Sequence, residues 1–104
     1  MNYIVKARAR LDLKNYWRYI ARDNLPAADR LLDAAEQTFK LIAENPEIGS
    51  QRSFRKLVGI RSRAVTGFRN YLVFYQTRGE TVVIARVLHG MRDLPTFFST
   101  PIPA

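Results

Sequence analysis

The chain has 104 residues, of which 47% are hydrophobic and 12% aromatic, and it contains no cysteine. A chain of this length fits one domain with a modest core. The lack of cysteine excludes a disulfide framework, a cysteine nucleophile and a thiolate zinc site. No apolar run approaches the roughly 20 residues that span a bilayer, and the N-terminal residues lack the apolar stretch of a signal peptide. We therefore expect a cytoplasmic protein without a membrane segment.

Positive charge is concentrated in the second half of the chain. Residues 1–48 contain eight basic and seven acidic side chains, whereas residues 49–104 contain nine basic and only two acidic ones. All nine of these basic residues are arginine except Lys56. A basic domain with its excess charge in one region has the electrostatics of a polyanion binder. Because guanidinium groups pair with phosphates and carboxylates alike, the expected partner is nucleic acid or an acidic protein, and the plain alternative is a surface kept charged for solubility.

The first part of the chain predicts a strand followed by a helix. In residues 2–6, Tyr3 and Val5 face one side and Ile4 the other, and β-branched residues favour a strand. From residue 7 to about residue 23, apolar side chains recur at helical spacing and form one stripe. That stripe comprises Ala9, Leu13, Tyr16, Trp17 and Ile20.

A second helix is predicted from residue 25 to about residue 44. Asn24 is a suitable N-cap, and Pro26 falls in the first turn, where its missing N–H group costs nothing. The pair Asn45–Pro46 ends the helix because proline restricts the residue before it. Two amphipathic helices joined by a short turn should form an antiparallel hairpin. The apolar face of the second helix comprises Ala28, Leu31, Leu32, Ala35, Phe39 and Ile42.

The remaining sequence predicts a loop over residues 46–59 and then three strands. The strands are expected at residues 60–65, 70–76 and 81–88, with a tight turn before the last one. Because residues 71–75 are apolar on both faces, their strand should lie in the centre of the sheet. The predicted fold class is α+β: an N-terminal strand, an antiparallel two-helix hairpin packed on one face, and a three-stranded antiparallel sheet.

Four segments of the chain carry a family resemblance: Tyr19–Asn24, Asn45–Gly49, Tyr71–Tyr75 and Arg86–Leu94, the last reading Arg-Val-Leu-His-Gly-Met-Arg-Asp-Leu. Together they resemble the ParE toxins of the ParE/RelE superfamily of bacterial type II toxin–antitoxin systems. The resemblance implies a toxin domain over residues 1–95 and a C-terminal tail over residues 96–104. The chain departs from the family in this longer, proline-containing tail. It also departs at the first helix, where Ala7 stands in place of a capping Ser or Thr.

The resemblance implies a toxin that inhibits DNA gyrase by binding it, and thereby blocks replication. No metal, nucleotide or organic cofactor is expected, because the sequence contains no Gly-rich phosphate loop, no His pair at ligand spacing and no carboxylate cluster. The side chains expected to contact the target are basic: Arg52, Arg55, Lys56, Arg61, Arg63, Arg69 and Arg92.

The resemblance also implies a partner, a cognate ParD-type antitoxin that forms a hetero-oligomer with the toxin. The C-terminal segment of such antitoxins is acidic and partly disordered, and segments of this kind fold on binding. Aromatic and apolar anchors expected for this partner are Leu11, Tyr16, Trp17, Tyr19, Phe97 and Phe98. Tyr16 and Trp17 have a plain alternative as core residues, because they belong to the apolar stripe.

RelE-like members of the superfamily cleave mRNA on the ribosome, and this remains the alternative function. Cleavage needs an acid–base pair and cations that stabilise the transition state. The available set is His89, Arg69, Arg86 and Tyr71. His89 has a plain alternative as a hydrogen-bonding residue at the end of a strand, and Arg92 with Asp93 as a local brace. A third possibility is an inactive or diverged member that only binds its antitoxin, or a host-derived interaction module. Because the His-Gly-x-Arg-Asp segment follows the ParE pattern, we predict binding without catalysis.

Overall fold

The computed structural model describes residues 1–54 and 57–93. The predicted contact residues Arg55, Lys56, Phe97 and Phe98, and the boundary of the tail, lie outside these ranges. The helices and strands within them are β1 (Asn2–Val5), α1 (Ala7–Ala21), α2 (Leu25–Glu44), β2 (Ser50–Phe54), β3 (Leu57–Val65), β4 (Phe68–Arg78) and β5 (Thr81–His89).

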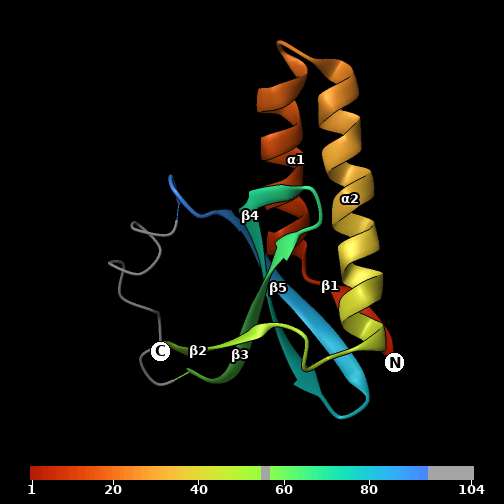
Figure 1. Cartoon of the computed structure of the whole chain (residues 1–104), viewed down its shortest axis with the longest axis vertical. Helices are drawn as coiled ribbons and strands as arrows, with labels where there is room; N and C mark the ends of the chain where they lie inside the picture. Colours follow the sequence, from red (N-terminus) through yellow and green to blue (C-terminus); the bar gives the residue numbers. More distant parts are fainter. Residues whose placement is uncertain (55–56, 94–104) are drawn as a thin grey trace.

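The strands form a single five-stranded sheet in the order β1-β5-β4-β3-β2. β1 runs parallel to β5, and the other neighbours are antiparallel. The two helices lie side by side as an antiparallel hairpin, and one end of that hairpin extends past the sheet (Figure 1). The predicted α+β fold, with its N-terminal strand and helical hairpin, is confirmed. The sheet is larger than predicted, because β1 and β2 add a strand at each edge.

The strand β2 lies within the segment that the sequence predicts to be a loop. Ser50 lies opposite Ser62 of β3, and Arg52 lies opposite Ile60. The sequence Ser-Gln-Arg-Ser-Phe has none of the apolar alternation by which a half-buried strand is recognised. Pairing with β3, rather than a pattern of its own, makes this edge segment a strand.

The core lies between the helical hairpin and the inner face of the sheet. Its largest fully buried side chains include Leu31 and Ile42 from α2 and Tyr75 and Ile84 from the sheet. β4 lies third in the strand order, so its predicted central position is confirmed. The predicted apolar stripe of α2 is confirmed with one correction. Leu32 is 37% exposed and is not part of the buried face to which Leu31 belongs.

The two helices begin differently. Asn24 caps α2 as predicted: its side-chain oxygen accepts a hydrogen bond from the backbone N–H of Ala27 at 3.0 Å. The N-cap of α1 is Lys6, one residue before the predicted position, and its side chain makes no capping hydrogen bond. Among the described residues, neither helix is long and apolar enough to cross a bilayer.

Candidate functional site

Side chains of α1 cover the part of the β5 edge that β1 leaves open. β1 pairs with β5 only as far as Ile84, and β5 continues to His89. Beyond β1, the backbone N–H of Val87 donates to the Asp12 carboxylate at 3.0 Å. The backbone N–H of His89 donates to the Tyr16 hydroxyl at 2.9 Å. Because unpaired backbone groups are costly when buried, these two side chains take the place of a neighbouring strand.

Asp12 also neutralises Arg86. The Nε and Nη2 atoms of Arg86 donate to the two carboxylate oxygens of Asp12 at 2.8 and 3.0 Å. Asp12 is only 7% exposed, and a buried carboxylate requires such partners. Asp12 is not among the site residues predicted from the sequence, although a signal for it exists. It occupies the apolar stripe of α1, three residues after Ala9 and four before Tyr16, where a lone carboxylate indicates a buried partner.

Hydrogen bonds among three residues hold the turn after β5 against α1: Tyr16, His89 and Asp93. The Tyr16 hydroxyl donates a hydrogen bond to the Asp93 carboxylate, which also accepts from the backbone N–H of His89. Burial, reinforced by the hydrogen bond to Asp93, raises the pKa of Tyr16 well above its usual value. Asp93 is therefore a brace, as one interpretation of the sequence held, but its side-chain partner is Tyr16 rather than Arg92.

The structure brings together only part of the candidate nuclease set. Tyr71 lies opposite His89 across the β4–β5 ladder, and the two rings pack edge to face with their centroids 5.0 Å apart. The Nδ1 atom of His89 accepts the backbone N–H of Arg92 at 3.2 Å. Arg86 is bound by Asp12. Arg69 is exposed and lines a surface hollow beside β3. The described residues contain no group of three or more His, Cys, Asp or Glu side chains that could hold a metal ion.

The residues predicted to bind an antitoxin differ in exposure. Leu11 and Tyr19 on α1 are 42% and 58% exposed, whereas Tyr16 packs against the core. Trp17 is half-buried, and its indole N–H donates to Asp29 of α2 at 2.9 Å.

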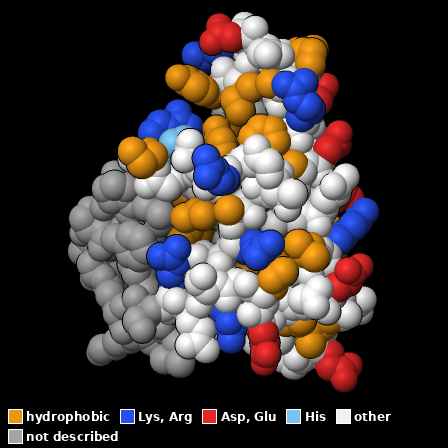
Figure 2. All heavy atoms as spheres, in the orientation of Figure 1, with side chains coloured by type: hydrophobic (Ala, Val, Ile, Leu, Met, Phe, Trp, Pro, Cys, Tyr) orange, Lys and Arg blue, Asp and Glu red, His pale blue; other side chains and the backbone are white. Residues whose placement is uncertain are grey.

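The Arg92 guanidinium lies over the Tyr19 ring, 5.0 Å from its centroid. Hydrophobic side chains gather over the upper part of the helical hairpin in Figure 2.

The predicted target-binding arginines have different surroundings. Arg61 is used within the fold, because its guanidinium donates to the carbonyl groups of Gly49 at 2.7 Å and Glu47 at 3.2 Å. The Tyr75 hydroxyl holds the same loop: it donates to the Pro46 carbonyl and accepts the N–H of Gly49, both at 2.8 Å. Together these contacts clamp the connection between α2 and β2.

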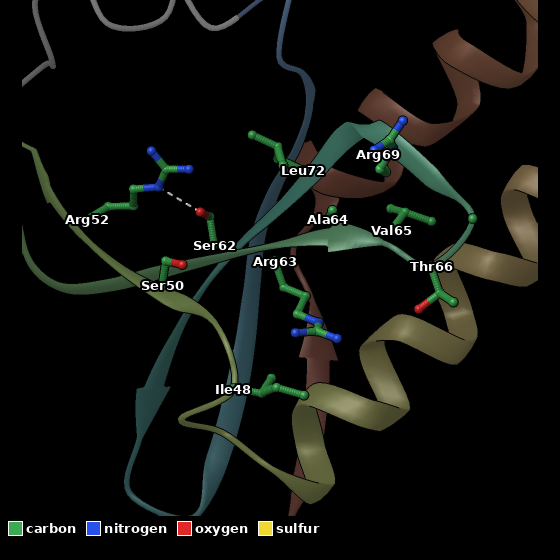
Figure 3. A pocket seen from close by; sticks show the side chains of 11 residues that line it. Ile48, Ser50, Arg52, Ser62, Arg63, Ala64, Val65, Thr66, Arg69 and Leu72 are labelled. Carbon is green, nitrogen blue, oxygen red and sulfur yellow. Dashed lines mark hydrogen bonds between the residues drawn. The ribbon is translucent and has the colours of Figure 1, made fainter.

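Three other arginines line a surface hollow of about 370 Å³ beside β3 (Figure 3), which we call the arginine hollow. Arg52 comes from β2, Arg63 from β3 and Arg69 from the beginning of β4. The Nε atom of Arg52 donates to the Ser62 hydroxyl at 2.7 Å. The remaining lining residues are Ile48, Ser50, Ser62, Ala64, Val65, Thr66, Gly67 and Leu72.

Comparison with known proteins identifies the family. The model of a family described as the ParE toxin of the type II toxin–antitoxin system parDE matches residues 3–94. A solved chain from the chromosomal ParDE toxin–antitoxin system of P. aeruginosa shares the fold, with 16% identity and a TM-score of 0.71 over 86% of this chain and 95% of that one. A search of curated proteins gives no significant match. The family match spans nearly all of the described residues, and the chain therefore belongs to the ParE toxin family of type II toxin–antitoxin systems.

Proposed function

We propose that this toxin inhibits DNA gyrase by binding it and holding it on cleaved DNA, and that a ParD-type antitoxin neutralises the toxin. Membership of the ParE family supports both parts of the proposal. The excess of arginine in the second half of the chain supports a target that is negatively charged, as a gyrase–DNA complex is.

The observation that carries the proposal is the engagement of Arg86 and His89 within the fold. Both Nε and Nη2 of Arg86 are bound to the buried Asp12 carboxylate, so its charge is compensated before any substrate arrives. The Nδ1 atom of His89 accepts the backbone N–H of Arg92, so this nitrogen is engaged in the turn after β5. Arg86 and His89, two members of the candidate nuclease set, thus make contacts within the fold, and this favours action by binding.

The surface of α1 supports the proposed contact with an antitoxin. Tyr19 and Leu11 are exposed, and Arg92 lies over the Tyr19 ring. Tyrosine and arginine are frequent anchors of protein interfaces. A disordered acidic segment that folds on binding could cover such a surface and pair with the arginine at its margin.

Incubation of the purified toxin with gyrase, ATP and supercoiled plasmid tests the first part of the proposal. We expect linear DNA to accumulate after denaturation of gyrase, and the cognate antitoxin to suppress it. The variant His89→Asn, which keeps an acceptor near the Nδ1 position, should poison gyrase as well as the wild type. If gyrase activity is unaffected while mRNA is cut on translating ribosomes, and His89→Asn abolishes that cutting, the RelE-like function is correct instead.

A binding measurement with the antitoxin tests the second part. Replacing Tyr19 by Ala should weaken the complex about tenfold, as expected for a moderate interface anchor. Gln37→Ala on the exposed side of α2 is the control and should leave the affinity unchanged. Equal affinities for the wild type and Tyr19→Ala would place the antitoxin elsewhere on the toxin.

A further inference from the structure

We infer that the arginine hollow binds the phosphodiester backbone of DNA. This deepens the proposed function, on which it rests, by making the DNA held by gyrase a direct ligand of the toxin. Three features of the hollow support the inference: its position where β3 extends past β2, the lack of acidic side chains among its described lining residues, and the hydroxyl groups that accompany the guanidinium groups.

The hollow forms where β3 continues past its edge neighbour. Pairing between β2 and β3 ends at Ser50 and Ser62, whereas β3 runs on to Val65. In Figure 3, Arg63 points toward Ile48 on the side of β3 opposite to Ser62. Arg52 reaches the Ser62 side, so guanidinium groups approach the open edge from both faces of the sheet. An extended anion lying along this edge could therefore contact more than one arginine at once.

The positive charge of the hollow comes from its arginine side chains. Of the described residues that line it, none is Asp or Glu. Arg63 is half-buried and Arg69 exposed, and neither side chain has a hydrogen bond or ion pair within residues 1–54 and 57–93. Arg86 and Arg61 provide the contrast, since a carboxylate binds the first and two carbonyl groups bind the second. Clustered cations without counter-charges raise the local concentration of an anionic ligand.

The neighbouring hydroxyl groups favour a phosphate over a carboxylate. Ser50, Ser62 and Thr66 line the hollow together with the arginines. Because the Ser62 oxygen accepts the hydrogen of Arg52 Nε, its own hydroxyl hydrogen is available to donate to an anion. The two terminal nitrogens of Arg52 can donate to the same anion. Arginine and hydroxyl side chains are the usual donors to the phosphate oxygens of DNA, whose contacts position a protein without reading sequence.

Direct binding to a short fluorescein-labelled DNA duplex, followed by fluorescence anisotropy without gyrase, tests the inference. The decisive variant is Arg63→Gln with Arg69→Gln. Its matched control is Arg30→Gln with Arg78→Gln, which removes the same charge from exposed positions away from the hollow. We expect the first variant to bind about tenfold more weakly at low salt, and its plot of log affinity against log salt to be shallower by about 2, because two fewer phosphates are neutralised. The control should lose much less affinity.

Equal losses of affinity in the two variants would overturn the inference, because they would indicate a general effect of net charge. It would also be overturned if polyglutamate bound the hollow as tightly as DNA, since the site would then accept any polyanion. A parallel gyrase cleavage assay separates the two proposals. Gyrase poisoning by a toxin that does not bind DNA contradicts only the inference. DNA binding that depends on Arg63 and Arg69, without gyrase poisoning, supports the hollow and contradicts the proposed function.

Discussion

Asp12 and Arg86 form an ion pair that joins α1 to the far part of β5, although 74 positions separate them in the sequence. The same carboxylate accepts the backbone N–H of Val87. One side chain therefore neutralises the Arg86 guanidinium and provides the acceptor for an N–H group at the edge of β5. Because β1 ends before it reaches this part of β5, this ion pair is one of the contacts that hold α1 against the sheet there.

Replacing Asp12 by Ala should lower the free energy of unfolding by about 3 kcal/mol, because it leaves a partly buried guanidinium and a buried N–H without their acceptor. Urea denaturation followed by circular dichroism measures the change. The control is Asp33→Ala at an exposed position of α2, where a change within about 0.5 kcal/mol is expected. A result for Asp12→Ala that matches the control would mean that the pair contributes nothing to stability.

Replacing Tyr75 by Phe should destabilise the loop between α2 and β2. The substitution removes a hydroxyl that both donates to the Pro46 carbonyl and accepts the N–H of Gly49. We expect a loss of about 2 kcal/mol, because the buried N–H of Gly49 and the half-buried carbonyl of Pro46 lose their partner. Tyr19→Phe, at an exposed ring, is the matched control. Hydrogen exchange should show faster exchange of the Gly49 amide in Tyr75→Phe, and an unchanged rate would contradict the role of the hydroxyl.

Alkaline pH should weaken the fold through one buried and two half-buried tyrosines. Burial raises the pKa of Tyr16, Tyr71 and Tyr75 above the usual value of about 10. Above that pH the unfolded chain loses these protons while the folded chain keeps them, so the free energy of unfolding falls as pH rises. Urea titrations at neutral and strongly alkaline pH measure the fall. It should be smaller in Tyr16→Phe than in the wild type, and equal falls would show that Tyr16 does not contribute.

Arg61 and Arg63 should respond differently to the same substitution. Arg61→Gln should lower the free energy of unfolding by about 1.5 kcal/mol, because the guanidinium donates to two loop carbonyl groups. Arg63→Gln should leave stability within about 0.5 kcal/mol of the wild type and reduce gyrase poisoning. Thermal or urea denaturation, measured beside gyrase cleavage, separates the two effects. Comparable destabilisation in both variants would contradict the structural distinction between them.

Much of the fold could be predicted from the sequence, because the relevant signals are local. The spacing of Leu31, Phe39 and Ile42 places them on one face of a helix whatever surrounds it. Asn24 and Pro26 define the beginning of α2 through the geometry of a few adjacent residues. The apolar run at residues 71–75 similarly places its strand inside the sheet. The polar strand β2 was missed because it has no such signal of its own.

The roles of individual side chains in the candidate site could not be predicted in this way. The sequence determined that the second half of the chain is rich in arginine, and the four segments that resemble ParE toxins determined the family. Only the tertiary structure decided that Arg86 meets Asp12, that Arg61 clamps a loop, and that Arg63 faces an open hollow. Identical side chains acquire different roles because the group beside each one is set by strand register and by the course of α1 across the sheet, and these long-range contacts leave no periodic pattern in the sequence.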